Sequence, residues 1–159
     1  MTDEISKPVY VIDTCSLTEL KNKYPQKAFP SVWDLVEALA GEGRLISVEE
    51  VAVEIDAVAD EVTEWAKAHE SIFVELDEKL QLATRVVLAK FPNLIDVKKR
   101  KSSADPFVIA LALLREATVV TQEKPSGGPG KVKIPDVCQR LGIPCIPLLT
   151  MLLNEGLGS

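Results

Sequence analysis

The sequence has few of the residues that build disulfide frameworks or zinc sites. Its 3 cysteines among 159 residues are Cys15, Cys138 and Cys145, and no two of them form a CxxC pair. An odd and sparse set of this kind favours reduced thiols. His69 is the single histidine and lies in a polar setting near a predicted helix end, so we assign it no catalytic role.

Long apolar segments are also missing. No run approaches the roughly 18–20 apolar residues that a membrane-spanning helix needs. Residues 1–8 are polar and acidic, without the apolar core of a signal peptide. We therefore expect a cytoplasmic protein with no membrane association. The formal net charge of −6 argues against a protein that coats nucleic acid by charge alone. It leaves room for an enzyme that gathers acids around a cation.

The composition is that of one globular domain. With 47% hydrophobic and 26% charged residues, the chain can bury an adequate core. It contains neither an internal repeat nor a linker long enough to divide it. We expect a single domain over residues 1–159, with its core at about 9–150.

Short β-branched segments alternate with segments of helical periodicity. The predicted strands are residues 9–12, 44–47, 72–76, 117–121 and 145–148. The predicted helices are 17–24, 31–39, 47–65, 77–91, 105–114, 135–141 and 149–153, with capping boxes at Ser31 and Ser47 and a cap at Asp77. Strands that alternate with helices predict an α/β fold with a parallel sheet and helices on both faces.

Four acidic residues are candidates for a functional site because of their positions relative to the predicted strands and helices. Asp13 ends the first strand and Glu123 follows the fourth, so both should arrive at the carboxyl edge, where open α/β folds bind ligands. Asp105 opens a helix. Helix starts often face the opposite edge, so spacing alone does not place Asp105 at the carboxyl edge, and a bent connection would be required. Glu54 lies beside an apolar helical stripe.

Each acid also has a plainer interpretation. Asp13 and Asp105 are good helix N-caps. Glu54 suits a solvated helix face that it would share with Glu50, and Glu123 suits an ordinary loop.

Taken in order, these segments resemble the PIN-domain nucleases. The motifs that carry the resemblance are Asp13-Thr14 and Ser16-Leu17 after the first strand, Glu54 within 51–55, Ala104-Asp105 at the head of an apolar helix, and 119–123. The similarity covers about residues 9–149. It is strongest to a branch with the signature "IPDVC…GIPCI", here 134–138 and 142–146.

The resemblance implies a PIN-like three-layer α/β/α sandwich whose acids converge on one or two Mg²⁺ or Mn²⁺ ions. The metal ligands transfer as Asp13, Glu54 and Asp105. The fourth ligand is usually aspartate, and Glu123 stands there, so Thr121 or a water is an alternative. The implied activity is a metal-dependent endoribonuclease. Small members are often the toxin of a toxin–antitoxin pair and self-associate, so the implied partners are RNA, an antitoxin and a second copy in a homodimer.

This chemistry suits carboxylates because hard divalent cations prefer oxygen ligands. Clustered carboxylates repel one another, and without a cation at least one should have a raised pKa. We therefore expect metal-assisted in-line attack of water on a phosphodiester. Asp13, Glu54 and Asp105 would hold the metal and Glu123 would assist through water.

Several further residues are candidates for substrate binding. Thr14, Ser16 and Thr121 could orient water or phosphate, although hydroxyls after a strand are more often caps. The basic run Lys98, Lys99, Arg100 and Lys101 precedes Asp105, and Lys131 and Lys133 are weaker candidates. A basic run beside an acidic site could grip a nucleic-acid backbone, or it could be a solvated face.

Two other classes of function compete. A phosphatase with an aspartyl-phosphate intermediate wants a second Asp two residues after Asp13, where this chain has Cys15. Cys15 as a phosphatase nucleophile lacks a following Arg, since position 21 is Lys. The remaining alternative is a catalytically silent PIN-like module that binds nucleic acid or protein.

Overall fold

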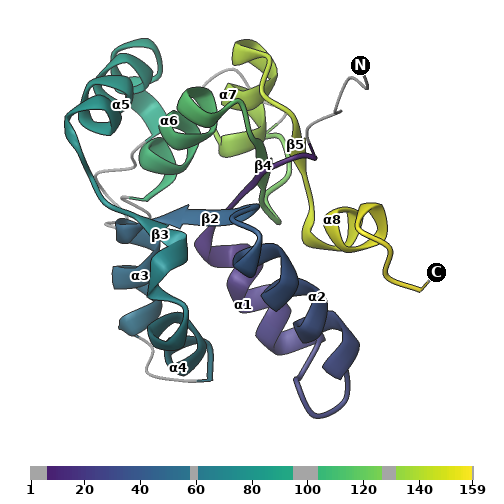
Figure 1. Ribbon diagram of the computed structural model, residues 1–159. Coiled ribbons are helices and arrows are strands. Elements are labelled where there is room, and N and C mark those ends of the chain that lie inside the picture. The colour runs from purple at the N-terminus through teal and green to yellow at the C-terminus, as the bar shows by residue number, and fades with distance from the viewer. Residues whose placement is uncertain (1–6, 58–60, 95–103, 127–131, 159) are drawn as a thin grey trace, which may run out of the picture.

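The computed structural model describes residues 7–57, 61–94, 104–126 and 132–158. The predicted basic run at 98–101 and Lys131 lie outside these residues. The centre of the fold is a sheet of five strands in the order β3-β2-β1-β4-β5, and every neighbouring pair is parallel (Figure 1). The strands are β1 (Tyr10–Ile12), β2 (Leu45–Val48), β3 (Phe73–Val74), β4 (Thr118–Val120) and β5 (Cys145–Ile146).

Eight α-helices and two 3₁₀ turns cover the sheet within the described residues. They are α1 (Thr14–Lys23), α2 (Pro30–Gly41), α3 (Glu49–Asp56), α4 (Glu61–Ala68), η1 (Glu70–Ile72), α5 (Glu78–Lys90), η2 (Pro92–Leu94), α6 (Asp105–Arg115), α7 (Ile134–Leu141) and α8 (Leu148–Asn154). Figure 1 shows α5, α6 and α7 on one face and α1 to α4 with α8 on the other. The predicted three-layer α/β/α sandwich with a parallel sheet is confirmed.

Strand β1 is the middle of the sheet and its three residues are buried. Val11 pairs with Ile46 on one side and with Val119 on the other. A strand buried on both faces needs apolar residues at successive positions, which explains the run before Asp13. The sequence therefore places Asp13 where the most central strand ends.

Two predicted helix starts are wrong. Helix α2 begins at Pro30, so Ser31 lies inside it, and its N-cap residue Phe29 makes no side-chain cap. Ser47 is a buried residue of β2, and its hydroxyl donates to Ile12 O at 2.5 Å rather than capping a helix. The predicted helix 47–65 is two helices, α3 and α4. The cap at Asp77 is confirmed, because Leu80 N donates to Asp77 Oδ1 at 2.8 Å.

Helix α6 is the core helix of its layer. The residues Val108 to Ala112 are all buried, as the apolar sequence predicts. Pro106 stands in its first turn, and the helix ends at Glu116 with a left-handed φ of 51°. It then leads directly into β4. Because a helix that connects two parallel strands runs antiparallel to them, α6 begins at the carboxyl edge of the sheet.

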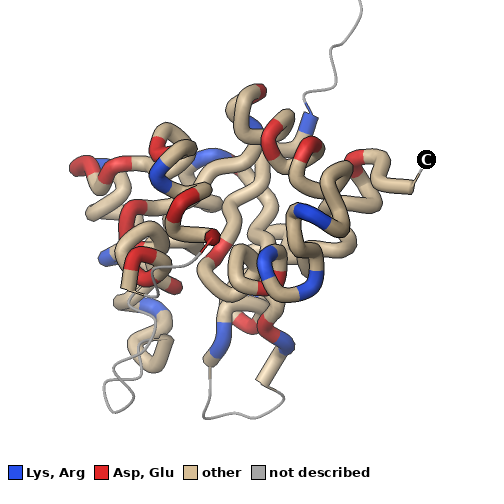
Figure 2. Tube along the Cα trace, turned by 90° about the horizontal axis from the view of Figure 1, so that it is seen from below, with Lys and Arg blue, Asp and Glu red and all other residues tan. Residues whose placement is uncertain are grey.

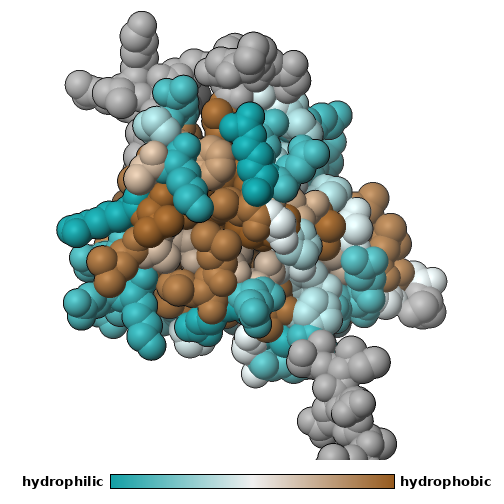
Figure 3. Space-filling view, turned by 90° about the horizontal axis from the view of Figure 1, so that it is seen from above, coloured by the Kyte–Doolittle hydropathy of each residue, from teal (hydrophilic) through white to brown (hydrophobic). Residues whose placement is uncertain are grey.

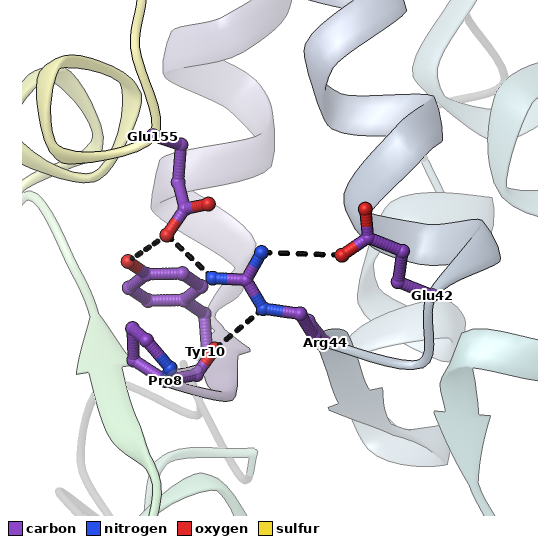
Figure 4. A network of polar contacts seen from close by, with 5 residues as sticks. All are labelled: Pro8, Tyr10, Glu42, Arg44 and Glu155. Carbon is purple, nitrogen blue, oxygen red and sulfur yellow. Dashed lines mark hydrogen bonds and ion pairs between the residues drawn. The ribbon is translucent and has the colours of Figure 1, made fainter. Parts of the chain in front are cut away.

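The opposite edge, where the strands begin, is held by an ion-pair network (Figure 4). Tyr10 Oη donates to Glu155 Oε2 at 2.7 Å, and Arg44 Nη2 lies 2.6 Å from the same oxygen. Arg44 also reaches Glu42 Oε2 at 3.2 Å and donates from Nε to Pro8 O at 3.0 Å. This Arg44 network joins the start of β1, the start of β2 and the end of α8.

In the described ranges, no helix is long and apolar enough to cross a membrane.

Candidate functional site

Asp13 is a buried carboxylate at the junction of β1 and α1. Its side chain is 3% exposed. Ser16 N donates to Oδ1 at 2.9 Å, so Asp13 does cap α1. Thr121, which follows β4, donates its hydroxyl to Oδ2. Burial raises the pKa of Asp13, and the hydrogen bonds from Thr121, Cys15 and Ser16 oppose that rise. Asp13 therefore caps α1 and also lies at the edge of the sheet, so the two interpretations are compatible.

Glu54 points at the same edge from α3. Thr14 donates its hydroxyl to Glu54 Oε2, and Ala104 N donates to Glu54 Oε1 at 3.3 Å. One carboxylate thus joins the first residue of α1 to the residue before α6. The interpretation of Glu54 as a freely solvated helix face is wrong.

Asp105, the first residue of α6, lies within electrostatic reach of all three other acids. Burial, followed by repulsion from Glu123, Asp13 and Glu54 in that order, raises its pKa to about 8. The general premise that helix starts face the opposite edge does not hold for α6, because α6 runs antiparallel to the strands. Its N-terminus arrives beside Asp13 without a bent connection.

Glu123 is held between β4 and α7. Its backbone N donates to Thr121 Oγ1 at 3.2 Å, and Ile134 N donates to its Oε2 at 3.1 Å. Burial raises the pKa of Glu123; the hydrogen bond from Ile134 opposes the rise, and Asp13 adds to it. Glu123 is thus placed by backbone groups on both sides, which an ordinary loop acid would not be.

We call Asp13, Glu54, Asp105 and Glu123 the acidic cluster. Its members come from four separate segments: the ends of β1 and β4 and the helices α3 and α6. Figure 2, which views the molecule from below, shows acidic positions of several segments gathered toward the middle of the trace. None of the four forms an ion pair with a described residue. Repulsion from the other three acids adds to the raised pKa of Asp105, and repulsion from Asp13 adds to that of Glu123.

The predicted substrate-binding hydroxyls separate into two groups. Thr14 and Thr121 both donate to members of the acidic cluster. Ser16 is fully buried and donates its hydroxyl to Val120 O at 3.1 Å, so it holds α1 against β4 and does not face a substrate. The basic run 98–101 lies outside the described residues, while Lys133 is exposed next to Glu123.

Two residues beside the cluster were not singled out for a site role. Cys15 Sγ donates to Asp13 Oδ2 at 3.0 Å, and burial together with the Asp13 charge raises the pKa of Cys15 to about 12. Gln122 donates to Glu19 Oε2 at 2.9 Å and accepts from Leu148 N at 2.7 Å. It therefore ties the end of β4 to α1 and α8. The only feature of the sequence that could have pointed to Gln122 is its position between Thr121 and Glu123.

The sequence matches the model of one protein family, Domain of unknown function (DUF4411), over residues 10–158. The chain belongs to the DUF4411 family. Among curated proteins there is no match.

Two solved structures are similar to this DUF4411 chain in the course of the backbone. The first is the crystal structure of VapBC2 from Rickettsia felis bound to a DNA fragment from their promoter. It has a TM-score of 0.47 and 17% identity, and the match covers 79% of this chain and 96% of that one. The second is PAE2754 from Pyrobaculum aerophilum, with a TM-score of 0.38, 14% identity, and coverage of 85% and 97%. The sandwich itself is established by the strand order and pairing given above.

The acidic cluster of this DUF4411 domain suits a hard cation in its chemistry. All of its donors are carboxylate oxygens, the ligands that Mg²⁺ and Mn²⁺ prefer. In the described part of the chain, no group of three or more His, Cys, Asp or Glu side chains is close enough together to hold a metal ion as it stands. Hydrogen bonds from neighbouring residues occupy several of the oxygens instead. The donor set therefore fits these cations, and its side chains would have to draw together around one.

A separate cavity lies between α3, α4 and β3. Its volume is about 680 Å³, and its lining includes Val53, Asp56, Thr63 and Phe73. Val53 and Ile55, the two neighbours of Glu54 in sequence, line this cavity, but Glu54 does not. This cavity is thus on the other side of α3 and contains no member of the acidic cluster.

Proposed function

We propose that this DUF4411 domain is a metal-dependent endoribonuclease that hydrolyses RNA phosphodiester bonds. The observation that carries the proposal is the gathering of four acids at one edge of the sheet, where burial and then repulsion from Glu123, Asp13 and Glu54 raise the pKa of Asp105 to about 8. A divalent cation is the partner that relieves such repulsion. The resemblance of the sequence motifs to the PIN-domain nucleases supports the same activity.

Asp13, Glu54 and Asp105 would hold Mg²⁺ or Mn²⁺, with Glu123 assisting. When bound, the cation lowers the pKa of a water molecule and neutralises charge on the phosphate. Hydrogen bonds within the chain hold two of these carboxylates in place. Ser16 N and Thr121 fix the carboxylate of Asp13, and Thr14 fixes that of Glu54.

Glu123 is the residue that we assign to proton transfer. The hydrogen bond from Ile134 N orients its carboxylate, and its raised pKa brings it closer to the range in which a carboxylate accepts a proton effectively. It would accept the proton of the attacking water.

We propose that the basic run 98–101 binds the RNA backbone. Three residues separate it from Asp105 in sequence, so an RNA strand that it binds would come near the acidic cluster. Replacing its four basic residues with alanine should weaken RNA binding and flatten the dependence of binding on salt, because fewer counterions are released. An unchanged salt slope would contradict this role.

An antitoxin protein and a second copy of the chain are the proposed protein partners. The resemblance to toxin-like PIN proteins supports the antitoxin. An apolar surface supports self-association: Leu82 and Val86 of α5 and Leu113 and Leu114 of α6 are between 37% and 53% exposed. Figure 3 shows apolar surface gathered on the side of the molecule that α5, α6 and α7 cover. Exposed apolar patches of this kind are typical of protein interfaces.

The second candidate function is a catalytically silent binding module. The observation that favours it is the engagement of the carboxylates by neighbouring N–H and O–H groups, with no three of the described side chains close enough to hold an ion. Such a module would bind nucleic acid or protein without cleaving it.

Cleavage of RNA by the purified protein separates the two functions. The nuclease requires Mn²⁺ or Mg²⁺, loses activity in EDTA and loses it in Asp13→Asn. The matched control is Asp34→Asn, which removes an exposed acid of α2 far from the cluster and should leave cleavage unchanged. Absence of cleavage together with absence of metal-dependent thermal stabilisation would favour the silent module. Cleavage that persists in Asp13→Asn would contradict the assigned site.

A further inference from the structure

Two of the cysteines face each other across a short reversal of the chain. Cys138 lies in the second half of α7, which ends at Gly142 with a left-handed φ of 71°. Ile143 N then donates to Cys138 O at 2.8 Å, and Val119 N donates to Pro144 O at 2.8 Å. These bonds turn the chain back and fix the start of β5 against β4. As a result the thiol of Cys138 hydrogen-bonds to the sulfur of Cys145.

The two sulfurs differ in environment. Cys138 is fully buried, whereas Cys145 is partly exposed. The hydrogen bond from Cys138 lowers the pKa of Cys145, although burial and the charges of Asp13 and Glu123 oppose that effect. The same contact, followed by burial, raises the pKa of Cys138. Cys145 is therefore the sulfur of the two that an oxidant can reach.

We propose that Cys138 and Cys145 form a reversible intramolecular disulfide that ties α7 to β5 when the protein meets a hydroperoxide. The assignment needs no nuclease activity. It rests on the contact between the two thiols, the turn that holds them together, and the exposure of one sulfur beside a buried partner.

The reaction balances with hydrogen peroxide as the oxidant. The Cys145 thiolate attacks one peroxide oxygen, the O–O bond breaks, and a sulfenic acid forms while hydroxide leaves and takes up a proton as water. The Cys138 sulfur then attacks the sulfenic sulfur. The S–S bond forms, the S–O bond breaks, and the hydroxyl leaves with the Cys138 proton as a second water. The two thiols lose two electrons in total, and the peroxide gains them.

The disulfide would lie next to the elements that hold Glu123. Ile134 N, one turn before Cys138 on α7, donates to Glu123 Oε2 at 3.1 Å. Thr121 N donates to Ile146 O, directly after Cys145, at 3.0 Å. Drawing the sulfurs from a hydrogen-bonded contact to a bond of about 2.05 Å therefore shifts the supports of residues 121–123. We expect oxidation to weaken Mn²⁺ binding about 10-fold, the size of effect seen when partners of metal ligands are disturbed. This last consequence depends on the proposed metal site.

Peptide mapping tests the disulfide directly. The folded protein is treated with hydrogen peroxide, its remaining thiols are alkylated, and it is digested with trypsin. Cleavage after Lys133 and Arg140 puts Cys138 in peptide 134–140 and Cys145 in peptide 141–159. The expected product is these two peptides joined, about 2 Da lighter than their sum, with Cys15 alkylated. Dithiothreitol should release them.

Matched variants assign the cross-link. Cys138→Ser and Cys145→Ser should each lose it, while Cys15→Ser should keep it. A wild-type map alone decides the question if a serine variant does not fold. The proposal is overturned if both thiols are alkylated after peroxide as fully as before it. It is equally overturned if Cys145 is oxidised without a cross-link, or if the cross-link contains Cys15. Because the readout is a mass, it is independent of RNA cleavage, so failure of the nuclease proposal would not be mistaken for failure of this one.

Discussion

The two edges of the sheet differ in whether their acidic side chains form ion pairs. At the edge where the strands begin, Glu155 and Glu42 both pair with Arg44, and Tyr10 completes the network (Figure 4). At the edge where the strands end, the acidic cluster brings four acids together, and none of them forms an ion pair with a described residue.

The pKa shifts record this difference. Burial would raise the pKa of Glu155, but hydrogen bonds from Arg44 and Tyr10 outweigh it, and the pKa is lowered. At the other edge burial acts together with repulsion and brings the pKa of Asp105 to about 8. The Arg44 network thus stabilises the fold by itself. The acidic cluster destabilises the metal-free fold whenever its members are all charged, and it gains most from a bound cation.

The largest effect should follow from Asp105→Asn. We expect cleavage to fall about 1,000-fold, or about 4 kcal/mol of transition-state stabilisation, because a proposed metal ligand is lost. The free energy of unfolding of the metal-free protein should rise at pH 8, by about 1 kcal/mol or roughly 3 °C in Tm, because a repelling charge is removed. Kinetic assays and thermal unfolding in EDTA measure the two effects. A variant that is both active and less stable would contradict the account.

The next largest effect should follow from Arg44→Met at the opposite edge. Removing the guanidinium leaves the carboxylate of Glu155 without its cation in a site where only about 12% of that side chain is exposed. The free energy of unfolding should fall by about 3 kcal/mol, as measured by urea unfolding. Binding of Mn²⁺ should be unchanged, since the network lies at the far edge.

Two variants sharpen that comparison. In Arg44→Met/Glu155→Gln the stranded charge is gone, so part of the lost stability should return. Glu42→Gln removes only the half-exposed partner and should cost about 0.5 kcal/mol or less. If Glu42→Gln cost as much as Arg44→Met, the network would owe its effect to something other than the buried pair.

The last prediction is a gradual effect, a slope of stability with pH. The pKa of Asp105 is about 8 in the folded protein and 3.8 for a free aspartate, so the folded state holds the proton more tightly between these values. Its contribution to stability is present below pH 3.8 and is lost as pH rises through about 8. One proton gives a slope of at most about 1.4 kcal/mol per pH unit. Urea unfolding in EDTA should show a shallower slope for Asp105→Asn than for the wild type, with Asp13 and Glu123 accounting for the remainder.

The sequence predicts the central part of this arrangement because it depends on local signals. The apolar run before Asp13 and the segment before Thr121 predict buried parallel strands whose carboxyl ends meet at one edge, and β1 and β4 do pair in parallel. Asp105 was expected at this edge only through the resemblance, because spacing alone did not place it there. The geometric reason that it lies there is that a helix between parallel strands runs antiparallel to them and starts at their carboxyl edge.

Contacts between segments far apart in the chain could not be predicted from the sequence. The Arg44 network joins residues more than one hundred positions apart, as Arg44 and Glu155 are separated by 111. Glu54 is fixed by Thr14 and Ala104, which no local pattern links to α3. The predicted capping box at Ser47 is wrong because its hydroxyl donates to Ile12 O on the neighbouring strand, a tertiary contact that outweighs a local preference.

Calorimetric titration with Mn²⁺ at pH 7 tests the central claim most directly. Because the pKa of Asp105 is about 8, binding of the cation should expel its proton. Titrations in two buffers of different ionisation enthalpy should show a release of about one proton per bound ion at pH 7, declining above pH 8. Asp105→Asn should lose that release, and Asp34→Asn should keep it. Millimolar Mn²⁺ that gives no binding heat in either buffer, or binding that Asp13→Asn and Asp105→Asn leave intact, would contradict the account.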